Sequence, residues 1–166
     1  MQARNLIVLV TCQMISATAT ISLVTLGGII GMTLSSNKAF VTLPLSLMVV
    51  AVAATAIPAT MLMRRIGRRF GFVLAAVFAA IGMFIGVFAL IHSSFTQFCT
   101  AARMLGANGA FTQQYRYAAA ESVAPEYVAR AISFVLLGPI GGAFLGKELA
   151  TRGQDWIEGI PYAGTM

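Results

Sequence analysis

Long apolar runs, separated by short polar stretches, follow one another along the chain. A membrane-spanning helix needs about 20 mostly apolar residues, and five of the runs are long enough. They cover residues 6–34, 40–63, 70–91, 98–120 and 131–149, and a sixth begins near residue 160. The pattern therefore predicts an all-α membrane protein of about five transmembrane helices, forming a single transmembrane domain over residues 1–166.

Transmembrane β-strands are the other way to cross a bilayer. They would appear as segments of roughly ten residues in which apolar and polar positions alternate, whereas these runs are longer and apolar on every side. The composition agrees with helices in lipid, since 58% of the residues are hydrophobic and 10% are charged. Soluble proteins carry about 25% charged residues. The lipid bilayer is therefore the expected surrounding of the chain.

The net charge of +6 sits in short basic clusters between the apolar runs. This placement is typical of membrane topology rather than of nucleic-acid binding. Basic residues mark the cytoplasmic side of a membrane protein. We therefore expect a cytoplasmic N-terminus in a bacterial cytoplasmic (inner) membrane. The expected cytoplasmic basic residues are Arg4, Arg64, Arg65, Arg68, Arg69, Arg116 and Arg130, against Lys38, Lys147 and Arg152 outside.

Residues 64–69 read Arg-Arg-Ile-Gly-Arg-Arg and are predicted to form a tight basic loop between the second and third helices. The stretch resembles the signature that the major facilitator superfamily carries at this place. Thr60 and Arg64 depart from it, because the family has a glycine and an acid there. The resemblance implies that the loop takes part in gating the transporter. The matching residues are Arg65, Gly67, Arg68 and Arg69.

Three later segments resemble motifs of the same superfamily. The resemblance covers the whole chain and implies the amino-terminal half of a twelve-helix secondary transporter, a bundle made of helices one to five and the start of six. The first segment is one residue shorter than the usual form, and the third lacks one residue of an antiporter motif. In order, the segments are Arg103 with Gly106 and Gly109, Glu121 with Pro125 and Arg130, and residues 138–142 (Gly-Pro-Ile-Gly-Gly).

Arg103 is the one charge well inside a predicted span. Charged groups at membrane depth are costly and usually mark function. The resemblance links this position to coupling or to the charge of the substrate, so an anionic solute is one hypothesis. The alternative is a structural arginine whose side chain reaches the interface.

Three amide side chains in helices one and four are further candidates for substrate binding, because amides must find partners away from water. They are Gln13, Asn108 and Gln113. In the superfamily these two helices line the central cavity. The alternative for polar groups in such helices is bonding to their own backbone or helix packing.

Gly138, Gly142 and Gly146 recur at steps of four and form a smooth helix face, beside which Pro139 permits a bend. Two interpretations stay open: a moving seam between the two halves, as the resemblance implies, or ordinary packing within this half. The similarity of this segment to an antiporter motif favours export.

No catalytic triad, phosphate-binding loop or metal-ligand spacing is present in the sequence, and His92 is its single histidine. We therefore expect no enzyme activity, no metal and no cofactor. The leading hypothesis is a secondary transporter that moves a small solute by alternating access, either an efflux or an anionic-solute carrier, completed by a second half or by partner membrane subunits. The alternatives are a non-transporting subunit or scaffold in a larger membrane complex, and a small transporter that dimerises.

Overall fold

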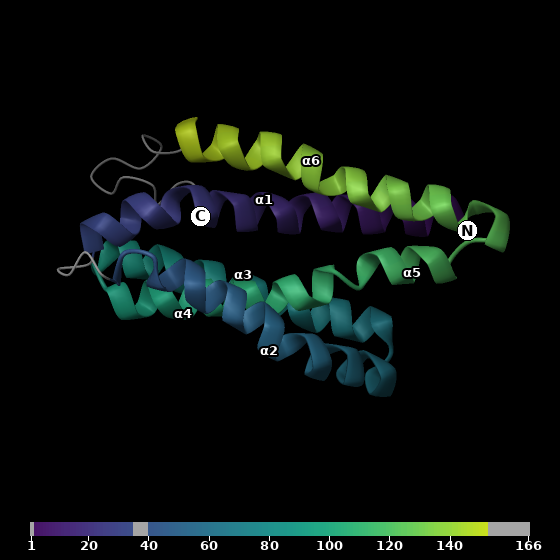
Figure 1. The fold of residues 1–166 in the computed structure, drawn as a ribbon, viewed down its shortest axis with the longest axis horizontal. Coiled ribbons are helices and arrows are strands. Elements are labelled where there is room, and N and C mark those ends of the chain that lie inside the picture. The colour runs from purple at the N-terminus through teal and green to yellow at the C-terminus, as the bar shows by residue number, and fades with distance from the viewer. Residues whose placement is uncertain (1, 35–39, 153–166) are drawn as a thin grey trace.

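A computed structural model describes residues 2–34 and 40–152 of the chain, and these residues form helices and no strands. Figure 1 shows the long helices extending along the longest axis of the molecule. A single 3-10 turn, η2 (Pro125–Tyr127), precedes the last helix. The helices are α1 (Gln2–Leu34), α2 (Leu43–Ile66), α3 (Arg68–Ile91), α4 (Phe95–Thr112), α5 (Tyr115–Glu121) and α6 (Val128–Arg152).

Four segments of the described chain are long and apolar enough to cross a membrane: Arg4–Thr25, Leu43–Ile66, Arg68–Ile91 and Pro125–Leu149. Large apolar side chains cover their outer surface, and many of the buried residues are alanines and glycines. Lipid solvates such an apolar exterior, while small interior residues let helices pack closely. The prediction of an all-α membrane protein is confirmed.

α4 is the inner helix of the bundle. It packs extensively against α2 and α3 and also touches α1. Eight of its 18 residues are buried, including Phe98 and Leu105. Because other helices surround it, α4 needs fewer lipid-facing apolar residues than its neighbours, which explains its more polar sequence.

The fourth predicted helix, residues 98–120, is interrupted in the structure. α4 ends at Thr112, and α5 begins at Tyr115 after a turn at Gln113 and Gln114. No proline or glycine lies in this turn, so the apolar pattern alone did not reveal it. The start of a sixth helix near residue 160 lies outside the described residues.

The predicted basic loop over residues 64–69 is reduced to one residue. α2 continues through Ile66 and α3 begins at Arg68, so only Gly67 separates the two helices. Its backbone has φ 84° and ψ 154°, a conformation that is essentially restricted to glycine. Arginine is a good helix former, and the four arginines therefore extend the two helix ends.

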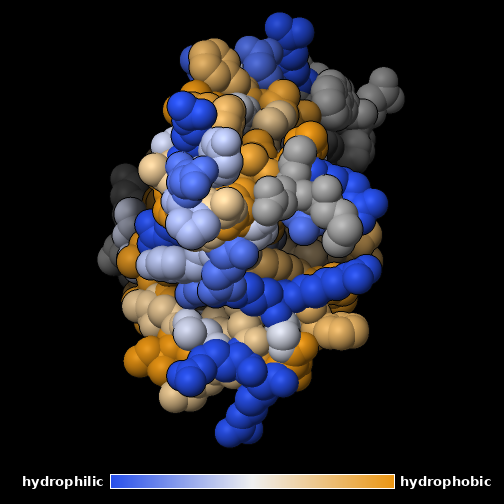
Figure 2. All heavy atoms as spheres, turned by 90° about the vertical axis from the view of Figure 1, so that its right-hand side faces the viewer, coloured by the Kyte–Doolittle hydropathy of each residue, from blue (hydrophilic) through white to orange (hydrophobic). Residues whose placement is uncertain are grey.

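α3 packs against α4 almost as extensively as α2 does. The two pairs with the most extensive contacts are α1 with α6 and α2 with α4. The colours in Figure 1 show that the two members of each pair run in the same direction. One end of the bundle gathers the start of α1, the α2–α3 junction and the connection from α5 to α6. We call it the arginine-rich end. Figure 2 looks onto it and shows hydrophilic side chains in bands between apolar ones.

Candidate functional site

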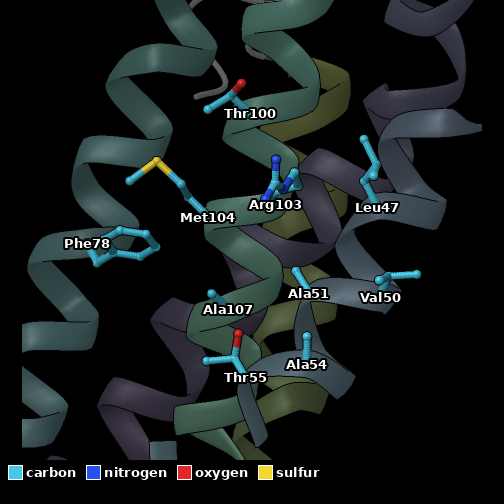
Figure 3. A pocket seen from close by; sticks show the side chains of 10 residues that line it. All are labelled: Leu47, Val50, Ala51, Ala54, Thr55, Phe78, Thr100, Arg103, Met104 and Ala107. Atoms are coloured by element: carbon cyan, nitrogen blue, oxygen red, sulfur yellow. The ribbon is translucent and has the colours of Figure 1, made fainter. Parts of the chain in front are cut away.

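A hollow beside α4 holds the one arginine in the middle of that helix. Arg103 lines a cavity of about 530 Å³, together with five residues of α2 and with Phe78 of α3. Figure 3 shows Arg103 next to Leu47 of α2, while Phe78 enters from the opposite side of the hollow. The volume falls within the range of small-molecule sites, about 300–1,000 Å³. The cavity is thus large enough for an organic solute.

The Arg103 side chain is exposed toward this cavity, and in residues 2–34 and 40–152 it has no ion pair or hydrogen bond. Leu47 and several alanines make the walls mainly apolar, and two hydroxyls interrupt them, those of Thr55 and Thr100. The Thr100 hydroxyl already donates to the carbonyl of Thr96 at 3.0 Å. A cation between apolar walls interacts strongly with anionic or carbonyl oxygens, because little water competes.

Asn108 lies close to the same site. It is 7% exposed and lines a second hollow of about 350 Å³ between α3 and α4. Thr55, Phe78 and Ala107 line both hollows, so the two adjoin. The structure therefore brings Arg103 and Asn108 to neighbouring places. We call the two adjoining hollows, of about 530 and 350 Å³, the hollowed face. Asn108 also borders a narrower groove of about 200 Å³ between α1 and α3.

The other two predicted amides lie elsewhere. Gln13 projects from α1 against Gly138 of α6, and its Oε1 atom is buried without a hydrogen-bond partner among the described residues. Gln113 is exposed in the turn that ends α4. The structure therefore does not gather the four predicted residues into one site.

A polar cluster joins three helices at the arginine-rich end. Arg68, the first residue of α3, forms an ion pair with Glu121 at the end of α5. Its guanidinium also donates to the backbone carbonyl of Gln114 at 3.5 Å. The Gln114 amide donates in turn to the hydroxyl of Thr60 on α2, at 3.2 Å. The cluster thus holds the α4–α5 turn against the ends of α2 and α3.

The remaining residues of the predicted gating loop have different surroundings. Arg65 is exposed at the end of α2, and Gly67 forms the one-residue junction. Arg69 is exposed in the first turn of α3 and faces a cavity beside α1. Of the four, only Arg68 takes part in the polar cluster. Thr60 departs from the superfamily signature, and its hydroxyl is the acceptor of the Gln114 bond.

The predicted glycine face of α6 packs against α1. A Cβ atom added at Gly142 would lie 2.6 Å from the Cβ of Ala17, and one at Gly146 would lie 3.0 Å from the Thr18 carbonyl oxygen. Ser22 of α1 donates a buried hydrogen bond to the Gly146 carbonyl at 3.3 Å. Pro139, inside α6, is only partly buried. In this bundle the glycine face is therefore covered by α1.

Clusters that could hold a metal ion, meaning three or more His, Cys, Asp or Glu side chains, are not found in the part of the chain that the structure describes. The polar groups of the hollowed face are one guanidinium, one amide and two hydroxyls. Such a set can bind and orient a solute by hydrogen bonds and charge. It lacks the nucleophile and base of a hydrolytic site.

Comparison with known proteins shows similarity to a membrane transporter. The chain is 34% identical over 163 residues to the riboflavin transporter RfnT of Brucella anthropi. The alignment covers 98% of this chain and 41% of that transporter, so the chain spans less than half of the length of this relative. No protein-family model matches the chain, and no solved structure matches it.

Proposed function

We propose that the chain forms one bundle of a secondary transporter that moves a small solute across the membrane by alternating access. The observation that carries the proposal is the similarity to a riboflavin transporter, which extends over 98% of the chain. An all-α bundle with a hollowed, mainly apolar face around Arg103 is what half of such a transporter requires. The second half, or a partner membrane subunit, would close this face.

The helix pairing supports an architecture of the major facilitator type. Each half of such a transporter contains two inverted repeats of three helices. We take α4 and α5 together as the fourth span and α6 as the fifth. The repeat symmetry relates the first span to the fourth and the second to the fifth, so a contact between spans one and five has its counterpart between spans four and two. These two pairs, α1 with α6 and α2 with α4, make the most extensive contacts of the bundle.

A riboflavin-like solute suits the chemistry of the hollowed face. Riboflavin has a flat heteroaromatic ring system with carbonyl oxygens and carries a hydroxylated chain. Phe78 offers an aromatic ring for stacking, Arg103 offers donors for carbonyl or anionic oxygens, and Asn108 both donates and accepts. The buried, unpaired amide oxygen of Gln13 and the exposed amide of Gln113 are candidate contacts in another state of the transport cycle.

The polar cluster around Arg68 is the candidate cytoplasmic gate. It lies where the superfamily carries its gating signature, and it ties α3 to the α4–α5 turn. This role implies a cytoplasmic N-terminus in a bacterial inner membrane. Fusing a periplasmic phosphatase or a cytoplasmic fluorescent protein to residue 1 tests the orientation, and phosphatase activity there would contradict it.

A chimera tests the transport function. The matching segment of the Brucella anthropi transporter is replaced by this chain, and riboflavin uptake is measured in cells without riboflavin uptake of their own. We expect uptake, with a loss of about tenfold or more for Arg103→Gln, because a hydrogen bond to a charged group contributes about 1.5–3 kcal/mol. Lys147→Gln, which removes an exposed charge at the far end of α6, is the matched control.

The conservative Arg103→Lys variant separates charge from geometry. Partial uptake by this variant would show that the positive charge binds the solute, whereas full activity of Arg103→Gln would contradict the assignment. A chimera that inserts in the membrane, folds and leaves riboflavin outside would favour the non-transporting subunit.

A further inference from the structure

A basic cavity lies at the arginine-rich end, apart from the hollowed face. It has a volume of about 520 Å³ and is bounded by the first turns of α1, the first turn of α3 and the middle and end of α5. Arg4 and Asn5 come from α1, Arg69 from α3, and Ser122 from the turn after α5. Segments distant in the sequence therefore place two cations and two neutral polar groups around one cavity.

The cavity carries uncompensated positive charge. Arg4 and Arg69 have no ion pair in the described residues, and neither α1 nor α3 has an acidic residue in its first turn. Both helices also direct the positive ends of their dipoles toward this end. Glu121, the acid at the end of α5, is already paired with Arg68. A bound anion would reduce the electrostatic repulsion between Arg4 and Arg69.

The rest of the cavity lining is apolar. It consists of Val8, Leu9, Phe72 and Ala118. Arg4 and Arg68 begin two of the segments that are long and apolar enough to span a membrane. The arginine side chains therefore lie at the level where the apolar spans end, which is the level of lipid headgroups.

We infer that this cavity binds the phosphate group of an anionic phospholipid. The guanidinium groups of Arg4 and Arg69 would hold the phosphate, with the Asn5 amide as a further donor. The acyl chains would leave over Val8, Leu9 and Phe72. A guanidinium matches phosphate oxygens in geometry as well as in charge. The site would tie the start of α1 to the start of α3.

Native mass spectrometry of the purified full chain in detergent tests this inference, with phosphatidylglycerol as the lipid. We expect a retained phosphatidylglycerol molecule, and we expect its affinity to fall about 30-fold in the Arg4→Gln/Arg69→Gln variant, from two arginines at about 1 kcal/mol each. The control variant Arg64→Gln/Arg130→Gln removes the same charge at the same end, from residues outside the cavity lining, and keeps the lipid.

Two further measurements keep the test decisive. Arg4→Lys/Arg69→Lys retains both charges and should keep most of the affinity, and circular dichroism checks that each variant remains helical. Competition with inorganic phosphate and glycerol phosphate distinguishes a lipid phosphate from a soluble one. If either displaces phosphatidylglycerol at millimolar concentration, the cavity is a site for a soluble phosphate compound. The inference is overturned if both Gln variants lose lipid equally, or if neither lipid nor phosphate binds.

Discussion

The two helix pairs with the most extensive contacts are held together in different ways. α1 and α6 meet along a row of glycines. Gly138, Gly142 and Gly146 lie close to successive residues of α1 that are also four positions apart: Gln13, Ala17 and Ile21. The contacts involve the α1 backbone at all three positions. This pair has a continuous seam in which two backbones lie close together over several turns.

On α4, one glycine lies directly against the backbone of α2. A Cβ atom at Gly106 would overlap the carbonyl oxygen of Met48, whereas one at Gly109 would meet only a methyl group of Val52, at 3.3 Å. Figure 1 shows α2 inclined to α4. Nearer the arginine-rich end, the turn after α4 contacts α2 through the hydrogen bond from Gln114 to Thr60.

From this difference we expect α1 and α6 to move as a unit and α2 to be able to tilt against α4. A seam of backbone contacts has few ways to slide, while a single close contact can act as a pivot for the helix that crosses it. The Arg103 cavity lies beside α2 at this crossing. The comparison predicts that the free energy of unfolding depends strongly on one glycine in the α2–α4 pair. In the α1–α6 pair it should depend on several glycines, each to a smaller extent.

The largest expected effect is that of Gly106→Ala. The added methyl group overlaps backbone atoms of Met48, which cannot rotate away as a side chain could, so α2 must shift. We expect a loss of about 3 kcal/mol in the free energy of unfolding, the upper range for overpacking. Titration of the detergent-solubilised protein with SDS, followed by circular dichroism, measures it.

Gly109→Ala is the matched control, three residues further along the same helix and facing the same partner. Its methyl group meets only the side chain of Val52, at 3.3 Å, which needs to yield by a few tenths of an ångström. We therefore expect a change below about 0.5 kcal/mol, the usual size for mild substitutions. Equal losses in the two variants would contradict the idea that the α2–α4 pair depends on one close contact at Gly106.

An alanine scan of the α6 glycines should give a graded series instead. Gly142→Ala brings a methyl group to 2.6 Å from Ala17 and 2.8 Å from a backbone oxygen, and we expect a loss of about 2 kcal/mol. Gly146→Ala and Gly138→Ala should each cost about 1 kcal/mol, because their closest contacts are longer or involve a flexible side chain. SDS titration of the three variants measures the series.

Gly28→Ala on α1 provides the baseline for the scan, since an added Cβ atom there has open space. The prediction is contradicted if only one of the α6 substitutions lowers the free energy of unfolding and the other two behave like Gly28→Ala. The α1–α6 pair would then depend on a single glycine, as we expect for α2–α4.

The sequence predicted the helices because their apolar runs are long, but it could not assign their partners. Gly138, Gly142 and Gly146 form a face in any helix, and only the fold shows that α1 covers it. The walls of the Arg103 cavity come from residues such as Leu47 and Phe78, which lie far from Arg103 in the sequence.

The breaks between helices show a second limit. Gly67 lies within the loop predicted over residues 64–69, but the sequence did not show that this residue alone separates the two helices. The α4–α5 turn was not predicted, since it contains no glycine or proline. Its stabilising bonds come from Arg68 and Thr60 on other helices, so the signal is tertiary and is absent from the local sequence.

Ser22→Ala removes the side-chain hydrogen bond of the α1–α6 seam. The Ser22 hydroxyl is 1% exposed and donates to the Gly146 carbonyl. Such bonds between membrane helices average about 0.6 kcal/mol, and we expect a loss of this size in SDS titration. Ser133→Ala, whose exposed hydroxyl bonds within α6, should change nothing measurable. A loss above that of Gly142→Ala would mean that polar bonding dominates this seam.

The smallest effect belongs to the ion pair that joins α3 to α5 at the arginine-rich end, beside the α2–α4 pair. Arg68 and Glu121 side chains are 33% and 64% exposed, so water screens their attraction. A double-mutant cycle with Arg68→Gln and Glu121→Gln should give a coupling energy of about 0.5 kcal/mol. At 1 M salt, where the Debye length is about 3 Å, the coupling should fall toward zero. A coupling that exceeds the Gly106→Ala loss and resists salt would mean that this ion pair contributes more to the stability of the bundle than the close contact at Gly106.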